Sequence, residues 1–183
     1  PPTRHPLLYR IWFEYMVPAA LARHKADLFV SPDGFLSTRT KVPQLAVIHD
    51  LNFVHRPKDL PFFTSLYYNR FFPLFARKAC RIATVSTYSK NDIISTYAID
   101  PSKIDIVWSG RHSVYTPVEE PSREKIREKY TGGQPYFLYI GSLHPRKNVD
   151  GLLSAFELFK KRTGSAIKLV IVGGKMFKTG KIS

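Results

Sequence analysis

The chain has 183 residues, of which 44% are hydrophobic and 23% charged, a balance that is ordinary for globular proteins and excludes a disordered or collagen-like chain. Its 28 lysines and arginines outnumber 14 aspartates and glutamates, so the formal net charge is +14. This excess favours an anionic partner: nucleic acid, a phosphate-bearing ligand or an acidic membrane surface. The single cysteine, Cys80, excludes an intramolecular disulfide and a CxxC or Cys/His zinc site, and we expect it to be buried and structural.

Six short apolar runs follow one another along the chain, and most end in turn-forming or polar residues. They cover residues 28–30, 45–48, 81–85, 104–108, 136–140 and 167–172. Near-continuous apolar runs of this length are typical of strands that are buried on both faces of a parallel sheet. Because helical patterns lie between them, the sequence predicts a doubly wound α/β architecture.

Three of these helical patterns are well marked. Residues 62–80 are rich in aromatic side chains, and Pro73 is expected to kink or split a helix there. Ser89 and Asp92 resemble a capping box that opens a helix, and residues 149–159 have helical spacing behind an N-cap at Asn148. Core packing is the default interpretation of the aromatic set, with contact to a membrane or a lipid-linked acceptor as the alternative; the set is Phe62, Phe63, Tyr67, Tyr68, Phe71, Phe72 and Phe75.

A segment rich in proline, glycine and charge interrupts the alternation. It contains Pro117, Pro121 and the pair Gly132–Gly133, with a short charged helix between them. We therefore predict a linker at residues 116–134, which joins one α/β unit at 1–115 to another at 135–183.

The loop at residues 141–148 follows a predicted strand and opens a helix. Gly141 permits a tight turn, and the helix N-terminus offers free N–H groups beside Ser142. Arg146 and Lys147 add two positive charges, so the loop has the chemistry of a diphosphate site. The alternative is a solvated basic pair in an ordinary loop.

His49 and Asp50 directly follow another predicted strand. The carboxyl ends of parallel strands form the ligand crevice of such sheets, where a histidine can contact a polar substrate and an aspartate can orient it or bind a hydroxyl. The alternative is a histidine that satisfies a backbone group. Gly173 and Gly174 end the last strand and either allow close approach of a nucleotide or simply terminate it. Ser86 and Ser89 are better explained as N-caps than as ligand contacts.

These segments, taken together and in order, resemble the family-four (group 1) retaining glycosyltransferases of GT-B fold. The resemblance lies in residues 48–53, 83–90, 136–148 and 169–174. It implies two Rossmann-like domains around a nucleotide-sugar, an acceptor-side domain first and a donor domain second. It implies that Arg146 and Lys147, with Gly141 and Ser142, hold the donor diphosphate, and that His49, beside Asp50, contacts the donor sugar near the reacting carbon. Transfer would proceed with retention, the leaving phosphate would take the acceptor proton, and no metal or other cofactor would be needed.

We therefore expect a GT-B glycosyltransferase fragment of polysaccharide biosynthesis, with both parallel-sheet units incomplete in this chain. Its partners would be a nucleotide-sugar donor and a saccharide or lipid-linked acceptor, and we expect it in the cytoplasm, with peripheral contact to the cytoplasmic face of a membrane as an option. We expect this chain alone to bind nucleoside diphosphates weakly and to transfer no sugar. The alternatives are a basic α/β module that binds nucleic acid, and an inactive or phosphorylase-type GT-B relative.

Overall fold

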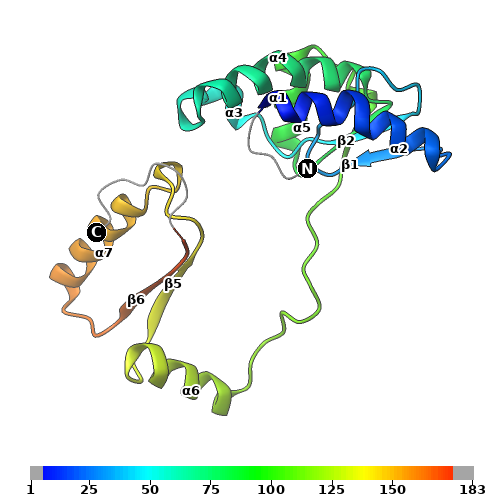
Figure 1. Cartoon of the computed structure of the whole chain (residues 1–183). Coiled ribbons are helices and arrows are strands. Elements are labelled where there is room, and N and C mark those ends of the chain that lie inside the picture. Colours follow the sequence, from blue (N-terminus) through cyan, green and yellow to red (C-terminus); the bar gives the residue numbers. More distant parts are fainter. Residues whose placement is uncertain (1–5, 175–183) are drawn as a thin grey trace. The chain divides into compact units, whose positions relative to one another are not determined.

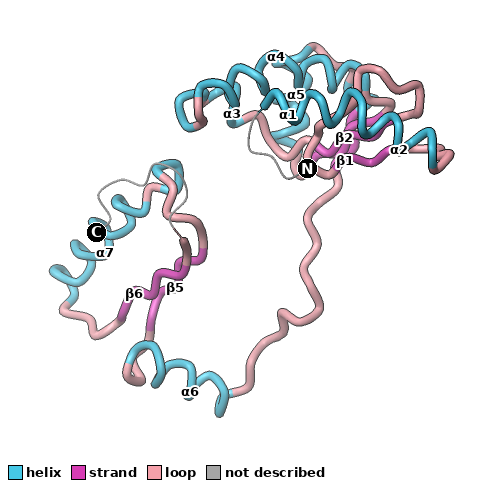
Figure 2. The backbone as a smooth tube through the Cα atoms, viewed as in Figure 1, coloured by secondary structure: helices cyan, strands magenta, loops and turns pink. Residues whose placement is uncertain are grey.

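The computed structural model describes residues 6–174, which Figure 1 shows coloured along the chain and Figure 2 by secondary structure. The chain divides into two compact units, residues 1–111 and 112–183, and each has its own parallel sheet. All six predicted strands are present, so the predicted α/β class with parallel sheets is confirmed. The linker predicted at residues 116–134 contains helix α6 (Glu120–Thr131), which belongs to the second unit.

The first unit is built from four strands and the helices that connect them. The strands are β1 (Phe29–Ser31), β2 (Gln44–Val47), β3 (Arg81–Thr84) and β4 (Ile104–Ile106). Its helices are α1 (Pro6–Ile11), α2 (Val17–Arg23), α3 (Asn52–His55), α4 (Phe62–Lys78) and α5 (Thr87–Tyr97), with shorter turns η1 (Trp12–Met16), η2 (Pro57–Asp59) and η3 (Pro101–Lys103).

The four strands are all parallel and lie in chain order, β1-β2-β3-β4. Helix α4 connects β2 to β3 and helix α5 connects β3 to β4, so both connections move to the next strand in the same direction across the sheet. Crossovers of this kind are right-handed, and two of them in the same direction put their helices on the same face of the sheet. On that face Ala46, Ile82 and Ile104 are in register and at most 1% exposed. On the other face Val30 is 52% exposed, so the expectation that the strands are buried on both faces is wrong for the described residues of this sheet.

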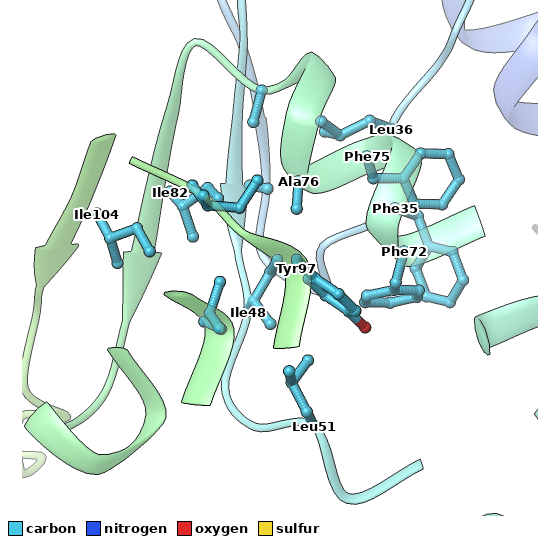
Figure 3. Close-up of a cluster of buried hydrophobic side chains, with 14 of the residues drawn as sticks. Phe35, Leu36, Ile48, Leu51, Phe72, Phe75, Ala76, Ile82, Tyr97 and Ile104 are labelled. Carbon is cyan, nitrogen blue, oxygen red and sulfur yellow. The ribbon is translucent and has the colours of Figure 1, made fainter. Parts of the chain in front are cut away.

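The core lies between this buried sheet face and the helices. Figure 3 shows Ile48, Ile82 and Ile104 from the sheet side and Phe72, Phe75 and Ala76 from α4 in one cluster. Phe35, which follows β1, packs by its ring on Tyr9, Phe13 and Tyr67, so α1 and η1 are tied to α4 through aromatic contacts. Truncation of a fully buried ring such as that of Phe75 to alanine typically costs about 3–5 kcal/mol.

Helix α4 runs through Pro73 without a split, although that residue cannot donate the helical hydrogen bond to Asn69, and the kink stays a prediction. The prediction that Cys80 is buried is wrong. Cys80 is exposed, because it lies in the bend between α4 and β3, where its N–H donates to the Gln44 carbonyl and the neighbouring Ala79 takes the buried position.

Helix α5 also begins earlier than the predicted capping box. Ser86 is the N-cap, and its hydroxyl accepts a hydrogen bond from the Ser89 N–H at 3.1 Å, whereas Ser89 itself is buried inside the helix. Asp92 is therefore too far along to cap, and it accepts from the ring of His55 at 2.8 Å instead. This contact joins α3 to α5.

The second unit pairs β5 (Tyr136–Ile140) with β6 (Lys168–Val172), joined by η4 (Pro145–Lys147) and α7 (Val149–Thr163). Phe137 contacts the rings of Phe156 and Phe159, with centroid distances of 6.5 and 5.9 Å, and so fixes α7 against the strand pair. Helix α6 is almost wholly polar outside Ile126 and ends at Gly132, whose φ of 60° lies in the left-handed region.

Candidate functional site

The chain leaves β2 at His49 in a direction that the neighbouring strand fixes. The Ile48 N–H donates to the Ala83 carbonyl at 2.9 Å, and the buried Thr84 hydroxyl donates to the Ile48 carbonyl at 2.7 Å. Both peptide groups of Ile48 are thus held by β3. His49, the next residue, is exposed at the carboxyl edge of the sheet, as the sequence predicts.

The imidazole of His49 is oriented by a backbone group of the loop after β1. Its Nε2 lies 3.1 Å from the carbonyl oxygen of Pro32. A carbonyl only accepts hydrogen bonds, so Nε2 carries a proton, and in the neutral ring Nδ1 is the acceptor. His49 therefore satisfies a backbone group, which was the alternative explanation from the sequence. It is also an exposed imidazole whose neutral form has a defined tautomer.

Asp50 forms a hydrogen bond with the backbone two residues further along the chain. Its Oδ1 accepts the N–H of Asn52 at 3.0 Å, which forms a turn that leads into α3. Among the described residues the hydrogen bonds of His49 and Asp50 go to backbone groups and not to each other. The structure therefore explains the position of Asp50 by chain geometry, and its second carboxylate oxygen stays available at the same edge.

In the second unit the structure brings together four of the six predicted residues. The Gly141 N–H donates to the Val172 carbonyl at 3.0 Å, and the Leu143 N–H donates to the Gly174 carbonyl at 3.1 Å. A Cβ placed on Gly173 would lie 1.8 Å from the Gly141 oxygen. Gly141, Ser142, Gly173 and Gly174 therefore form one close-packed backbone edge, and only glycine fits at position 173.

Arg146 and Lys147 lie in the short turn η4, directly before α7. His144 caps this turn, because its Nδ1 accepts the N–H of Arg146 at 3.1 Å. Both basic side chains are exposed, and neither has a hydrogen-bonding or ion-pair partner among residues 6–174. Two unpaired cations thus stand beside the first turn of α7.

That first turn also has donors to offer. Asn148 occupies the N-cap position, as predicted, but in the left-handed conformation and without a side-chain cap. Its amide lies over Gly151, where a Cβ would be 2.5 Å from the Asn148 nitrogen. Because the first N–H groups of a helix have no partners within the helix, they add partial positive charge next to Arg146 and Lys147. The loop can bind an anion.

Sequence reasoning missed three contacts that shape these edges. They are the Pro32 carbonyl on His49, the His144 cap of η4 and the pair between His55 and Asp92. A histidine in front of a proline at a helix start was a signal for the second contact. The first and third join residues 17 and 37 positions apart, and no local pattern reveals such pairs.

A hollow of about 470 Å³ lies elsewhere in the second unit. Arg123 and Arg127 of α6 line it together with Pro135 and Tyr136 at the start of β5. Since Gly141 follows the other end of β5, this hollow is not the predicted anion site.

Residues 6–174 contain no group of three or more histidine, cysteine, aspartate or glutamate side chains placed to hold a metal ion. The expectation that the chemistry needs no metal stays a prediction. Within the same residues, no helix is both long enough and apolar enough to span a bilayer.

Comparisons with known proteins match both units. Residues 1–112 match the family described as Glycosyltransferase Family 4, and residues 122–181 match Glycosyl transferases group 1. The chain is 28% identical over 174 residues to O-antigen chain mannosyltransferase B of Escherichia coli. The matched region covers 93% of this chain and 45% of that protein. It is 28% identical over 133 residues to O-antigen chain mannosyltransferase RfbU of Salmonella typhimurium. This match covers 72% of the chain and 33% of that protein.

The chain thus spans less than half the length of the curated relatives it matches. The family match to the first unit alone covers more than half of the whole chain, and the match to the second unit follows it in the expected order. The resemblance in the sequence motifs is confirmed: the chain belongs to glycosyltransferase family 4.

Proposed function

We propose that this protein takes part in the transfer of a sugar from a nucleotide-sugar donor to a saccharide or lipid-linked acceptor, with retention of configuration, in polysaccharide biosynthesis. Both compared relatives are named as O-antigen chain mannosyltransferases, which supports a hexose donor and a polysaccharide acceptor. Nucleotide-sugars are made and used in the cytoplasm in such a scheme, so we place the protein there.

One observation carries the proposal: Arg146 and Lys147 are exposed and unpaired among the described residues, at the start of α7. A nucleoside diphosphate is the leaving group of such a transfer, and negative charge grows on it as the glycosidic bond breaks. Charged donors that are already in place stabilise this charge more in the transition state than in the ground state. The forked guanidinium suits two phosphate oxygens, and the ammonium acts as a point charge.

Gly141 and Ser142 complete this proposed donor site from the end of β5. The Gly141 oxygen fills the space that a side chain at position 173 would need, so the ends of β5 and β6 lie in direct backbone contact beside the proposed site. The chain's own hydrogen bonds already hold this edge, which limits the reorganisation needed on binding. Gly174, where an added Cβ would meet none of the described residues within 4 Å, is the residue nearest to a nucleotide in this proposal.

His49 is the proposed contact to the donor sugar, by analogy with the family. The Pro32 carbonyl fixes its tautomer, so Nδ1 accepts a hydrogen bond from a sugar hydroxyl. Asp50 offers a second acceptor beside it. Retention follows if the departing phosphate takes the proton of the acceptor hydroxyl on the face from which it leaves, so no enzymatic base is required.

The test is the binding of uridine and guanosine diphosphates to this chain, measured by calorimetry. We expect Arg146→Ala and Lys147→Ala each to weaken binding about tenfold to a hundredfold, the worth of one charge-assisted hydrogen bond. Lys125→Ala is the matched control, because it removes one exposed lysine of α6 in the same unit. If the control weakens binding as much as the two loop variants, the charge acts non-specifically and the proposed site is wrong.

Transfer is tested in the longest natural protein that contains this chain, with a panel of nucleotide-sugars and mass spectrometry of the products. We expect His49→Ala to retain its thermal melt and diphosphate binding but to lose most transfer. Loss of the fold with intact activity in the folded fraction would make His49 structural.

A further inference from the structure

The aromatic residues of α4 fall into two groups that the sequence did not separate. Tyr67, Phe72 and Phe75 are at most 6% exposed and belong to the core, and Tyr68 and Phe71 are partly buried against it. Phe62 and Phe63, in the first turn, are 74% and 65% exposed. Leu66, one turn later, is 57% exposed. Residues three and four positions apart share a helix face, so these three form one apolar surface, here called the α4 tip.

The α4 tip is held rigidly, because the helix behind it is tied to the core. The Asn69 amide donates to the carbonyls of Phe53 and Ser65, at 3.1 and 2.9 Å, and so joins α3 to α4 directly below the tip. The rings of Phe62 and Phe63 contact each other edge to face with a centroid distance of 5.5 Å. Two large rings exposed side by side on an anchored helix are a feature that folded proteins use for binding.

The charges around the tip have one sign. Lys58 precedes it and Arg70 follows Leu66 by one helical turn, and both are exposed. The one acidic residue between positions 56 and 70 is Asp59, whose carboxylate is bound by Arg56 at 2.8 Å. Aromatic rings flanked by unpaired cations match the interface of an anionic bilayer, in which rings enter the boundary region and cations meet phosphate headgroups.

The topology places the tip at a defined edge of the unit. Helix α4 connects the carboxyl end of β2 to the amino end of β3, and these strands are parallel. Its first turn therefore lies toward the carboxyl edge of the sheet, the edge that carries His49. Figure 1 shows α3 beside the beginning of α4, in agreement with their contacts.

We propose that the α4 tip, Phe62, Phe63 and Leu66 with Lys58 and Arg70, docks this protein on the surface of an anionic lipid bilayer. The contact is peripheral and presents the carboxyl edge of the four-stranded sheet to the lipid surface. The inference stands on exposure and charge in the first unit, and it does not depend on nucleotide binding by the second.

The experiment is co-sedimentation of this chain with vesicles of phosphatidylcholine alone and of equal parts phosphatidylcholine and phosphatidylglycerol. We expect binding to the anionic vesicles that weakens with salt. The double variant Phe62→Ser/Phe63→Ser should bind at least about tenfold more weakly, since burial of one such ring is worth more than a tenfold change in affinity. Both side chains are exposed, so the thermal melt of the variant should match that of the parent chain.

Tyr130→Ser is the matched control, because it removes an aromatic ring of α6 that is 60% exposed and lies beside Lys129. Equal binding by the double variant and the parent chain would place the contact elsewhere, for example on the exposed apolar residues of α1 and η1, and would overturn the proposal. Equal binding to both kinds of vesicle would also contradict it, as would a chain dimer that the double variant loses in the absence of vesicle binding.

Discussion

The close contact of Gly173 with Gly141 gives a prediction whose size the structure sets. In Gly173→Ala the new Cβ would lie 1.8 Å from the Gly141 oxygen and 2.8 Å from its carbonyl carbon, whereas ordinary contact begins near 3.4 Å. Both neighbours are backbone atoms, so no side chain can rotate away. The ends of β5 and β6 must therefore separate by about 1.6 Å, the difference between the clash and an ordinary contact.

The free-energy cost has two sources. Overpacking that forces a backbone shift typically costs about 1–3 kcal/mol. The shift also strains the hydrogen bonds from Gly141 to Val172 and from Leu143 to Gly174, each worth about 0.5–1.5 kcal/mol. We expect Gly173→Ala to destabilise the second unit by about 2–5 kcal/mol in all.

The neighbouring glycine provides an unusually close control. A Cβ on Gly174 meets nothing within 4 Å among the residues that the structure describes, and its φ is not in the left-handed region. Gly174→Ala should therefore be neutral or stabilise by about 0.4–1 kcal/mol, because it reduces the freedom of the unfolded chain.

The assay is hydrogen exchange of residues 136–174 read by mass spectrometry, because Trp12 and Trp108 both lie in the first unit and tryptophan fluorescence reports on that unit. Protection of the Gly141 and Leu143 amides should fall about tenfold for each 1.4 kcal/mol lost, while segments of the first unit stay unchanged. Equal protection in the two alanine variants would refute the argument from close packing.

Two further predictions concern the first unit. Tyr67→Phe should leave stability unchanged or raise it by up to about 1–3 kcal/mol in denaturant titrations, because the Tyr67 hydroxyl is buried without a hydrogen-bond partner among the described residues. Burial also raises the pKa of Tyr67 to about 12, so the parent chain should lose stability as the pH rises from about 10, where the unfolded tyrosine ionises, and the phenylalanine variant should lose less; equal alkaline losses would contradict this. The hydrogen bonds from Arg81 hold the Asp105 pKa below its usual range, and Asp105→Asn removes the negative charge that they stabilise, so the variant should be slightly less stable at neutral pH. That difference should vanish well below the ordinary aspartate pKa of about 3.9, where the parent carboxyl is protonated too, and a difference that persists in acid would rule out the ion pair as its cause.

The strands were predictable because their apolar runs are short and end in polar or turn-forming residues. The open face of the first sheet was not, since an apolar run looks the same whether one face or both are covered. Val30 and Ala46 sit in equally apolar runs, yet one is 52% exposed and the other 0%. The strand order decides this difference, and order is a property of long-range pairing.

The candidate site shows the same division. The sequence predicts that His49 and Arg146 follow strands, because each stands within a few residues of an apolar run. It could not predict that His49 meets the Pro32 carbonyl or that Asp92 binds His55 instead of capping α5. The Gly173–Gly174 pair had two explanations, and the contact with Gly141 supplies a structural one for the first glycine while leaving the second open to a ligand.

Both units position their candidate residues by the same physical means, although their sheets differ in size. In each, the neighbouring strand holds the last peptide groups before the chain leaves the sheet: Thr84 holds Ile48 in the first unit, and Val172 with Gly174 holds Gly141 and Leu143 in the second. His49 directly follows such a held residue, so the position of its backbone is fixed as well. Arg146 and Lys147 lie further along and need the His144 cap as a second anchor. The residues that touch a ligand can therefore be few and exposed. The backbone contacts with the adjacent strand offset the conformational entropy that is lost when these residues are ordered.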